Sequence, residues 1–216
     1  GVQSKGLTVA GALTDAKGNR SLPPSQQADP DTNIRVTEVR DDGIVIRGAK
    51  LMICGTAASN EIFLLPGSVY READQDFSVA CAVPRDIKGL TIVEARRPSD
   101  GRDLEDGAEM EVPDTGVTQG WLLFDDVFVP NERVFMCKEF KYTAKVIQWF
   151  TANYRACIGA CVSGQGDVML GASILMARAN GLSTKTFAGK LTDISVNNQV
   201  TYGLGAGAIA LGFHHP

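Results

Sequence analysis

A polar loop with one glycine and one arginine follows the first strand-like segment of the chain. Its sequence is TDAKGNRS, residues 14–21. The backbone amides of such a loop can approach a phosphate group, with the Arg20 guanidinium as countercharge. The same composition is typical of an ordinary polar turn. The residues alone therefore leave two interpretations open, a phosphate-binding loop or a solvent-exposed turn.

A second group of residues that could carry chemistry consists of Tyr154, Cys157, Ile158 and Cys161. Their spacing places all four on one face of a helix. Two thiols one helical turn apart can bind a metal, but paired cysteines are also common as small apolar core residues. Cys54, just before Gly55 and Thr56 at a strand end, is a third such position. A core cysteine is again the alternative interpretation.

Histidine content excludes several reaction types. The chain has only His214 and His215, both next to its last residue. Ser-His-Asp triads, Cys-His pairs and His-rich zinc sites therefore cannot be assembled from the body of the chain. Acid–base chemistry must use carboxylates, Tyr, Lys, Cys, a cofactor or groups from another segment.

Charge and cysteine content exclude further classes of protein. The 21 Lys and Arg residues and 25 Asp and Glu residues give a net charge of -4 and are scattered singly. We therefore expect a solvated charged surface and no nucleic-acid partner. Five cysteines without disulfide-scaffold spacing indicate reduced thiols in a cytoplasmic setting. No segment is expected to be long and apolar enough to cross a membrane, so no membrane partner is expected.

The first part of the chain is predicted to consist of strands. Alternating segments are found at 6–13, 34–39, 44–51, 61–65, 77–83, 90–95 and 121–129. The sequence Arg40-Asp41-Asp42-Gly43 between two of them predicts a hairpin. Because no helix separates the strands, an antiparallel β-barrel or sandwich is favoured over a doubly wound parallel sheet.

The remainder of the chain is predicted to be helical. Residues 139–179 contain no proline and favour one or two helices. Asn180-Gly181 is predicted to end this helical stretch. Ser183 or Thr184 is predicted to cap a second helix that runs to about residue 211. The Gly- and Ala-rich segment 203–213 has no evident apolar partner within the chain. We therefore expect an oligomer, additional segments, or both.

Taken together, these segments resemble the 4-hydroxybutyryl-CoA dehydratase family along almost the whole chain. Two stretches are similar to its flavin-contacting segments: GALTDAKGNRSLPPSQQADPD at 11–31, and DGIVIRGAK at 42–50 followed by CGT at 54–56. The stretch FDDVFVPNERVFMC at 124–137 resembles the end of its β-domain. The stretch YRACIGACVSGQGDVMLG at 154–171 resembles its active-site helix.

The resemblance implies an α+β chain with an acyl-CoA dehydrogenase-like fold. Residues 1–138 would form the flavin-contacting β-barrel or sandwich, which is the middle domain of such proteins. Residues 139–216 would begin the C-terminal helical domain. The N-terminal helical domain and the rest of the C-terminal domain would be absent from this chain. Family members bind FAD, act on acyl-CoA substrates and form homotetramers, and the dehydratases carry a 4Fe–4S cluster.

Site residues follow from the resemblance position by position. The flavin-contacting residues would be Leu13, Thr14, Asp15, Gly18, Asn19, Arg20, Cys54, Gly55 and Thr56. Cys54 stands where a flavin-bonding Thr is expected. Cys161 matches a cluster-ligating Cys, and Tyr154 stands at the position of the cluster's His ligand. Gln119 stands at the position of a catalytic Glu.

Two further departures affect the expected reaction. Ile158 replaces a catalytic Tyr and cannot transfer a proton, and Val162 replaces a Lys and cannot hold a charge. Because Tyr can bind iron as a phenolate, the resemblance leaves a 4Fe–4S cluster open, with Tyr154 and Cys161 as its ligands from this chain. Tyr154 and Gln119 are the catalytic candidates that remain.

The leading hypothesis is an FAD-dependent acyl-CoA lyase or isomerase, similar to enzymes that dehydrate 4-hydroxybutyryl-CoA to crotonyl-CoA and isomerise vinylacetyl-CoA. The first alternative is a reduced-flavin-dependent aromatic monooxygenase of the 4-hydroxyphenylacetate 3-hydroxylase type. The second is a non-catalytic paralogous subunit, because several matched catalytic positions have lost their side chains.

Overall fold

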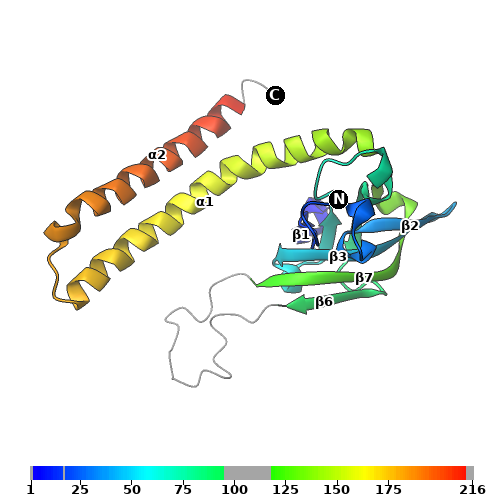
Figure 1. The fold of residues 1–216 in the computed structure, drawn as a ribbon, viewed down its shortest axis with the longest axis horizontal. Coiled ribbons are helices and arrows are strands. Elements are labelled where there is room, and N and C mark those ends of the chain that lie inside the picture. The colour runs from blue at the N-terminus through cyan, green and yellow to red at the C-terminus, as the bar shows by residue number, and fades with distance from the viewer. Residues whose placement is uncertain (1, 17, 95–117, 213–216) are drawn as a thin grey trace, which may run out of the picture. The chain divides into compact units, whose positions relative to one another are not determined.

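The computed structural model describes residues 2–16, 18–94 and 118–212. The chain divides into two compact units, residues 1–147 and 148–216. The first unit contains every strand that the structure describes, and the second is helical (Figure 1). Strands therefore precede helices along the chain, as the sequence predicts. The expected domain boundary after residue 138 stays a prediction.

The strands form two four-stranded sheets. One sheet has the order β1-β4-β5-β8, with strands at Val9–Ala12, Glu61–Leu64, Val79–Pro84 and Val134–Cys137. The other has the order β2-β3-β7-β6, with strands at Arg35–Val39, Gly43–Cys54, Gln119–Pro130 and Leu90–Glu94. Neighbouring strands are antiparallel except β1 and β4, which run parallel. The seven predicted strands are all present, and β8 is an additional one.

Apolar side chains from both sheets share one core. Ile46, Ile62, Val79 and Leu122, each from a different strand, are completely buried in the same cluster. Fully burying an aliphatic side chain of this size stabilises a fold by about 1.5–3 kcal/mol. Buried residues alternate with exposed ones along β1 and with half-buried ones along β4, the pattern from which the sequence predicts a two-layered β structure. The predicted hairpin is confirmed by the antiparallel pairing of β2 with β3.

The long strand β3 contains two irregularities in its pairing with β7. One lies between Ile46 and Gly48, and the other between Lys50 and Ile53. Gly48 has φ +123°, and a Cβ atom there would lie 2.1 Å from the carbonyl oxygen of Asn33. Met52, in the second irregularity, has φ +56° and a side chain that is 60% exposed. The second bulge carries β3 on to Cys54, three residues beyond the predicted strand end.

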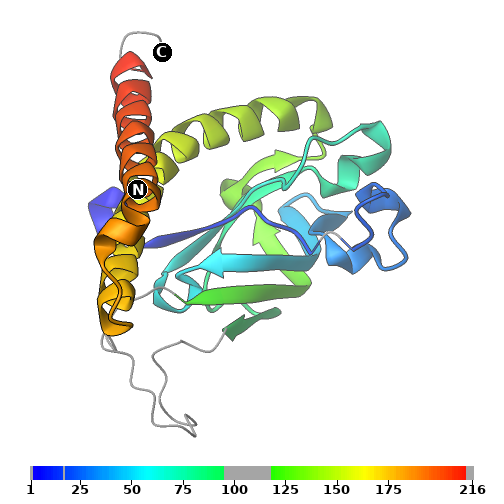
Figure 2. The ribbon, with the colours of Figure 1, turned by 60° about the vertical axis from the view of Figure 1, so that its left-hand side comes forward.

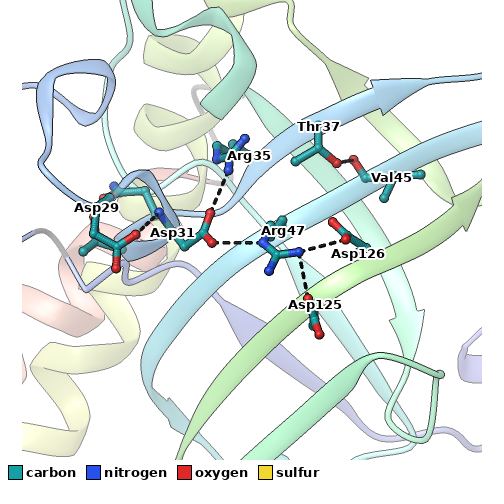
Figure 3. A network of polar contacts seen from close by, with 10 residues as sticks. Asp29, Asp31, Arg35, Thr37, Val45, Arg47, Asp125 and Asp126 are labelled. Carbon is teal, nitrogen blue, oxygen red and sulfur yellow. Dashed lines mark hydrogen bonds and ion pairs between the residues drawn. The ribbon is translucent and has the colours of Figure 1, made fainter.

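An arginine-centred network ties β3 to β7 and to the turn before β2 (Figure 3). The Arg47 Nε donates to Asp31 at 2.9 Å, and its Nη1 lies 2.8 Å from carboxylate oxygens of both Asp125 and Asp126. Arg35 also pairs with Asp31, at 2.8 Å. Burial raises the pKa of Asp31, but the hydrogen bonds from Arg35 and Arg47 outweigh it and lower the pKa overall.

Two long helices follow the strands. α1 is a single helix, Thr143–Ala179, and α2 is Ala188–Gly212. The predicted stop is confirmed, because α1 ends before Asn180 and Gly181 has φ +67°. Ser183 accepts a hydrogen bond from the Lys185 amide and caps the short turn before α2. Shorter 3-10 helices lie at Gln3–Lys5, Pro24–Gln26, Pro30–Thr32, Thr56–Ala58, Glu72–Phe77, Asn131–Arg133, Phe140–Tyr142 and Thr184–Phe187.

The two helices lie side by side in opposite directions (Figure 2). A Cβ atom on Gly159 would lie 3.5 Å from the Cα of Gly205, so glycines allow close approach of the backbones. The Asn198 amide donates to the carbonyl of Ser163 and to the carboxylate of Asp167, both at 2.7 Å. The prediction that segment 203–213 lacks a partner within the chain is therefore wrong at Gly205, although Phe213 lies outside the described residues.

Residues Phe140–Ala179 form a helix that is long and apolar enough to cross a membrane by length and composition alone. The expectation that no segment meets this criterion is therefore wrong for the described part of the chain. The test is met because this stretch combines many Ala, Gly, Val, Leu and Met residues with few charges. One such helix is weak evidence of a membrane span, since core helices of soluble proteins satisfy the same test.

Candidate functional site

The first predicted cofactor segment, residues 13–20, is hydrogen-bonded to β3, and β3 continues to the second predicted segment, residues 54–56. The Leu51 amide of β3 donates to the Thr14 carbonyl at 2.8 Å, and the Lys50 ammonium donates to the Leu13 carbonyl at the same distance. The Ala16 amide donates to the carbonyl of Thr32 at 3.0 Å. β3 continues from these contacts to Cys54, so one strand connects the segment at 13–20 with the segment at 54–56.

Asp15 is buried at the start of the loop. It is 3% exposed, and one carboxylate oxygen lies 2.6 Å from the Lys50 ammonium. The other accepts a hydrogen bond from the Tyr70 hydroxyl at 3.3 Å. Burial raises the pKa of Tyr70, and the neighbouring Asp15 carboxylate raises it further, so Tyr70 stays protonated and acts as a donor.

A pocket of about 250 Å³ opens beside this loop. Asp15 and Arg20, both predicted cofactor residues, contribute to its wall. The remaining lining residues are Leu22, Pro24, Gln27, Asn33, Gly67 and Ser68. The wall thus combines a guanidinium, amides and a hydroxyl with the Asp15 carboxylate, which is paired with Lys50, and the guanidinium is the group that suits a phosphate. Both interpretations of the loop, a binding loop and an ordinary turn, stay predictions.

The distal part of the loop is braced by one side chain. The Gln27 amide accepts from the Asn19 backbone N–H at 2.8 Å and donates to the carbonyls of Asn19 and Leu22. Gly18 has φ +44°, and a Cβ atom there would lie 2.4 Å from the Gln27 side-chain oxygen. Gly18 is thus needed both for the left-handed backbone and for the close approach of Gln27.

The second predicted segment lies at one end of the β2-β3-β7-β6 sheet. Cys54 is directly opposite Gln119 on β7, and the Gln119 side-chain amide donates to its sulfur at 3.6 Å. Gly55 has φ +71°, and its amide donates to the Thr118 carbonyl at 2.9 Å. Cys54 is exposed, so its interpretation as a core cysteine is wrong. The structure brings together Cys54 and Gln119, which the sequence places 65 residues apart.

Glu94 is a polar residue at this end of the sheet that sequence reasoning did not single out. Its carboxylate accepts a short hydrogen bond from the buried Thr56 hydroxyl. It pairs in register with Gly120, where a Cβ atom would lie 2.4 Å from the Thr56 hydroxyl oxygen. The alternation Leu90, Ile92, Glu94 on β6 was the available signal, because it directs the carboxylate to the same side as two core residues.

The helical candidates belong to the second compact unit. Cys157 and Cys161 are both exposed, and Tyr154 is 53% exposed and stacks on Phe150 with ring centroids 5.5 Å apart. The interpretation of the two thiols as core residues is therefore wrong for the described structure. They occupy the side of α1 away from α2, because Gly159 and Ser163 face that helix.

The described residues contain only part of the ligand set that a metal cluster would need. Within residues 2–16, 18–94 and 118–212, no group of three or more His, Cys, Asp or Glu side chains is arranged to hold a metal ion. Tyr154, Cys157 and Cys161 are three ligand-type groups on α1, fewer than a four-iron cluster needs. Residues from outside the described part of the chain would have to complete such a ligand set. His214 and His215 lie outside it.

The chain is similar to known flavin enzymes. It is 37% identical over 215 residues to the 4-hydroxybutyryl-CoA dehydratase/vinylacetyl-CoA-Δ-isomerase of Clostridium aminobutyricum, covering 98% of this chain and 44% of that protein. An oxygen-tolerant archaeal 4-hydroxybutyryl-CoA dehydratase from N. maritimus superposes with a TM-score of 0.82 at 32% identity, covering 94% of this chain and 41% of that one. The chain thus spans less than half the length of these relatives.

A third similarity concerns a solved structure with a flavin. The oxygenase component of 4-hydroxyphenylacetate 3-monooxygenase, complexed with FAD, superposes with a TM-score of 0.74 at 25% identity, covering 94% of this chain and 42% of that one. The expected α+β fold, a β-domain followed by long helices in the acyl-CoA dehydrogenase-like manner, is confirmed. Residues 1–136 match the family model described as 4-hydroxyphenylacetate 3-hydroxylase N terminal. The chain belongs to the 4-hydroxyphenylacetate 3-hydroxylase family and is similar to the 4-hydroxybutyryl-CoA dehydratases.

Proposed function

We propose that this chain is part of an FAD-dependent enzyme and that its β unit holds the flavin nucleotide. The observation that carries the proposal is that β3 joins the two predicted flavin-contacting segments. Lys50 and Leu51 of β3 donate hydrogen bonds to the carbonyls of Leu13 and Thr14 in the first segment. The same strand ends at Cys54, where the second segment begins. The residues proposed to contact FAD are Leu13, Thr14, Asp15, Gly18, Asn19, Arg20, Cys54, Gly55 and Thr56. FAD supplies a two-electron acceptor and donor that no side chain in the chain can replace.

The proposed site fits a dinucleotide by chemistry. Arg20 provides a positive charge at the pocket, and the backbone of Asn19 is fixed in place by Gln27. A pyrophosphate is bound well by a guanidinium beside a rigid loop, where backbone amides that have no partner in the loop can also donate. At the other segment, Met52 and Trp121 expose 60% and 52% of their surface near Cys54 and Gln119. Apolar and aromatic surface of this kind suits a planar ring system.

For the reaction, we propose an acyl-CoA lyase or isomerase related to the 4-hydroxybutyryl-CoA dehydratases. The high identity over nearly the whole chain supports this assignment. Gln119 can orient a substrate by hydrogen bonds but cannot take up a proton, and Ile158 and Val162 are equally inert. Of the two predicted catalytic residues, Tyr154 is then the one able to transfer a proton. The enzyme is proposed to act in the cytoplasm as a homo-oligomer, a tetramer as in the family.

A second candidate is a reduced-flavin-dependent aromatic monooxygenase. The specific observation that favours it is the residue at the position of the cluster's His ligand, which is Tyr154 in this chain. A monooxygenase of this type needs no cluster. The FAD-bound oxygenase component that shares the fold is a relative of this kind.

The test is an absorbance spectrum of the anaerobically purified full-length protein, with iron quantified on the same sample and FAD added by titration. Flavin bands, or tight uptake of added FAD, are expected. About four irons per chain would favour the dehydratase-type enzyme, and flavin without iron would favour the monooxygenase or a cluster-free acyl-CoA enzyme. A protein that neither contains nor binds FAD would contradict the proposal.

A matched pair of variants locates the site. Arg20→Gln removes the charge at the pocket and is expected to weaken FAD binding at least tenfold. Arg178→Gln makes the same change in the last turn of α1 and is expected to leave FAD affinity unchanged. Equal affinities of the two variants would place the nucleotide elsewhere.

A further inference from the structure

Lys50 is a charged residue that lies entirely inside the β unit. Its relative exposure is 0%, and it is the largest completely buried side chain among the described residues. Its ammonium has three oxygen neighbours: Asp15 at 2.6 Å, the Leu13 carbonyl at 2.8 Å and the Leu65 carbonyl at 2.8 Å. The ammonium donates hydrogen bonds to the two carbonyls and forms an ion pair with the carboxylate, whose Oδ1 accepts no hydrogen bond from the described residues. This arrangement departs from the expectation that charged side chains lie at the solvated surface.

The acceptors come from segments that follow two neighbouring strands. Leu13 and Asp15 follow β1, and Leu65 follows β4. Lys50 itself comes from β3, which belongs to the other sheet. The ammonium therefore joins both sheets at the point where the cofactor loop leaves β1.

The surroundings of Asp15 are built around the same contact. A Cβ atom on Gly67 would lie 2.0 Å from the Asp15 carboxylate oxygen that accepts the Tyr70 hydroxyl. Only glycine at 67 leaves this oxygen its space. Asp15 also lines the pocket together with Arg20, whereas Lys50 does not. Lys50 is thus one contact removed from any ligand in the pocket.

Stability alone is a poor reason for such a residue. Taking an ammonium and a carboxylate out of water is costly, and well-packed apolar residues of similar volume often replace a buried ion pair without loss. What an apolar side chain cannot provide is directional bonding to two loop positions at once. The hydrogen bond to Leu13 and the ion pair with Asp15 fix the loop start in position and orientation before any ligand binds.

We infer that Lys50 is a positioning residue for the FAD-binding loop. Its ammonium holds the backbone of residues 13–15 so that the Arg20 guanidinium and the backbone amides of Gly18 and Arg20 face the nucleotide. Lys50 makes no contact with the cofactor. This inference rests on the proposed function, because it assigns the loop to FAD. The arrangement of the loop itself does not depend on FAD and can be measured without it.

The experiment compares two buried substitutions on β3 in the full-length protein. Lys50→Met keeps the approximate length of the side chain and removes its charge. Ile46→Ala, at another completely buried position of β3, creates a cavity in the core without touching the loop. For each variant, FAD affinity is measured by quenching of flavin fluorescence, and backbone amide exchange of residues 13–20 is measured without FAD.

Lys50→Met is expected to weaken FAD binding at least tenfold and to speed amide exchange of residues 13–20 at least tenfold. Ile46→Ala is expected to change neither quantity more than twofold, even though it lowers thermal stability. Wild-type affinity and loop exchange in Lys50→Met would overturn the inference, as would equal losses in Ile46→Ala. If the wild-type protein bound no FAD, the proposed function would fail, and loop exchange would still decide whether Lys50 orders the loop.

A second variant covers the case in which Lys50→Met does not fold. Asp15→Asn keeps Lys50 with its two carbonyl acceptors, removes the charged contact and leaves one oxygen that can accept from the Tyr70 hydroxyl. The inference predicts faster amide exchange of residues 13–20 in this variant, with the exchange of β4 and β5 unchanged. Unchanged exchange of the loop would overturn it.

Discussion

The two compact units differ in which of their polar side chains are buried and bonded. In the β unit, charged groups such as Lys50 and Asp15 are buried and bonded, and they hold the loop that lines the pocket. In the helical unit, Tyr154 and Cys161 are exposed, and the buried polar contacts are made by Ser163 and Asn198 between the helices. The nucleotide part of the proposed site is thus preorganised within the described β unit. The helical candidates have no comparable support within their own unit.

The largest effect is expected from breaking the buried pair. Lys50→Met leaves the Asp15 carboxylate buried without its countercharge and should lower the free energy of unfolding by about 3–5 kcal/mol. The double variant Lys50→Met/Asp15→Asn removes both charges and should recover part of this loss. Urea unfolding of the wild type, both single variants and the double variant measures the coupling. A double variant whose loss equals the sum of the single losses would show that the pair is not coupled.

The same substitution should have opposite effects in the two units. Gly67→Ala forces a Cβ atom to within 2.0 Å of Asp15 and should cost about 1–3 kcal/mol. Gly171→Ala, in α1 where a Cβ atom would meet nothing within 4 Å, should stabilise by about 0.5–1 kcal/mol because Ala favours helix. Thermal unfolding of both variants measures the two signs. Two changes of the same sign would contradict the contrast between the units.

A smaller, pH-dependent effect is expected at Asp31. Its pKa in the folded state is lowered from the ordinary value of 3.8, so its ion pairs with Arg35 and Arg47 stabilise the fold above that value. The contribution is lost as pH falls through the lowered pKa. Asp31→Asn should therefore reduce the melting temperature slightly at pH 6 and converge with the wild type at strongly acidic pH. A difference that stays constant with pH would show that the charge is not involved.

Local patterns predicted much of the β unit, and long-range contacts explain what they missed. The alternating segments gave all seven expected strands, because each shows one face to the shared core. β8 was missed because its four residues, Val134–Cys137, are too short and uniform to alternate clearly. β3 was predicted to end at Leu51 because a bulge with Met52 at positive φ interrupts the alternation. The parallel pairing of β1 with β4 depends on segments about 50 residues apart.

Some residues of the candidate site were predicted from the sequence and others were missed. The resemblance identified Asp15, Arg20, Cys54 and Gln119, and the structure places them at the pocket or in a direct cross-strand contact. Lys50 was missed because its three oxygen neighbours come from two loops that no sequence spacing connects. Glu94 was missed because its partner Thr56 is on a distant segment. The roles of all these residues stay predictions until they are measured.

The most direct test of the central claim is alkylation of Cys54 in the full-length protein with and without FAD. The Cys54 thiol is exposed in the described structure, whereas burial raises the pKa of Cys81 to about 12 and makes that thiol an unreactive internal control. Mass spectrometry follows each cysteine separately. We predict that saturating FAD slows alkylation of Cys54 at least tenfold and leaves Cys81 unmodified throughout. Alkylation of Cys54 at the same rate with and without FAD would contradict the placement of the flavin between the two segments.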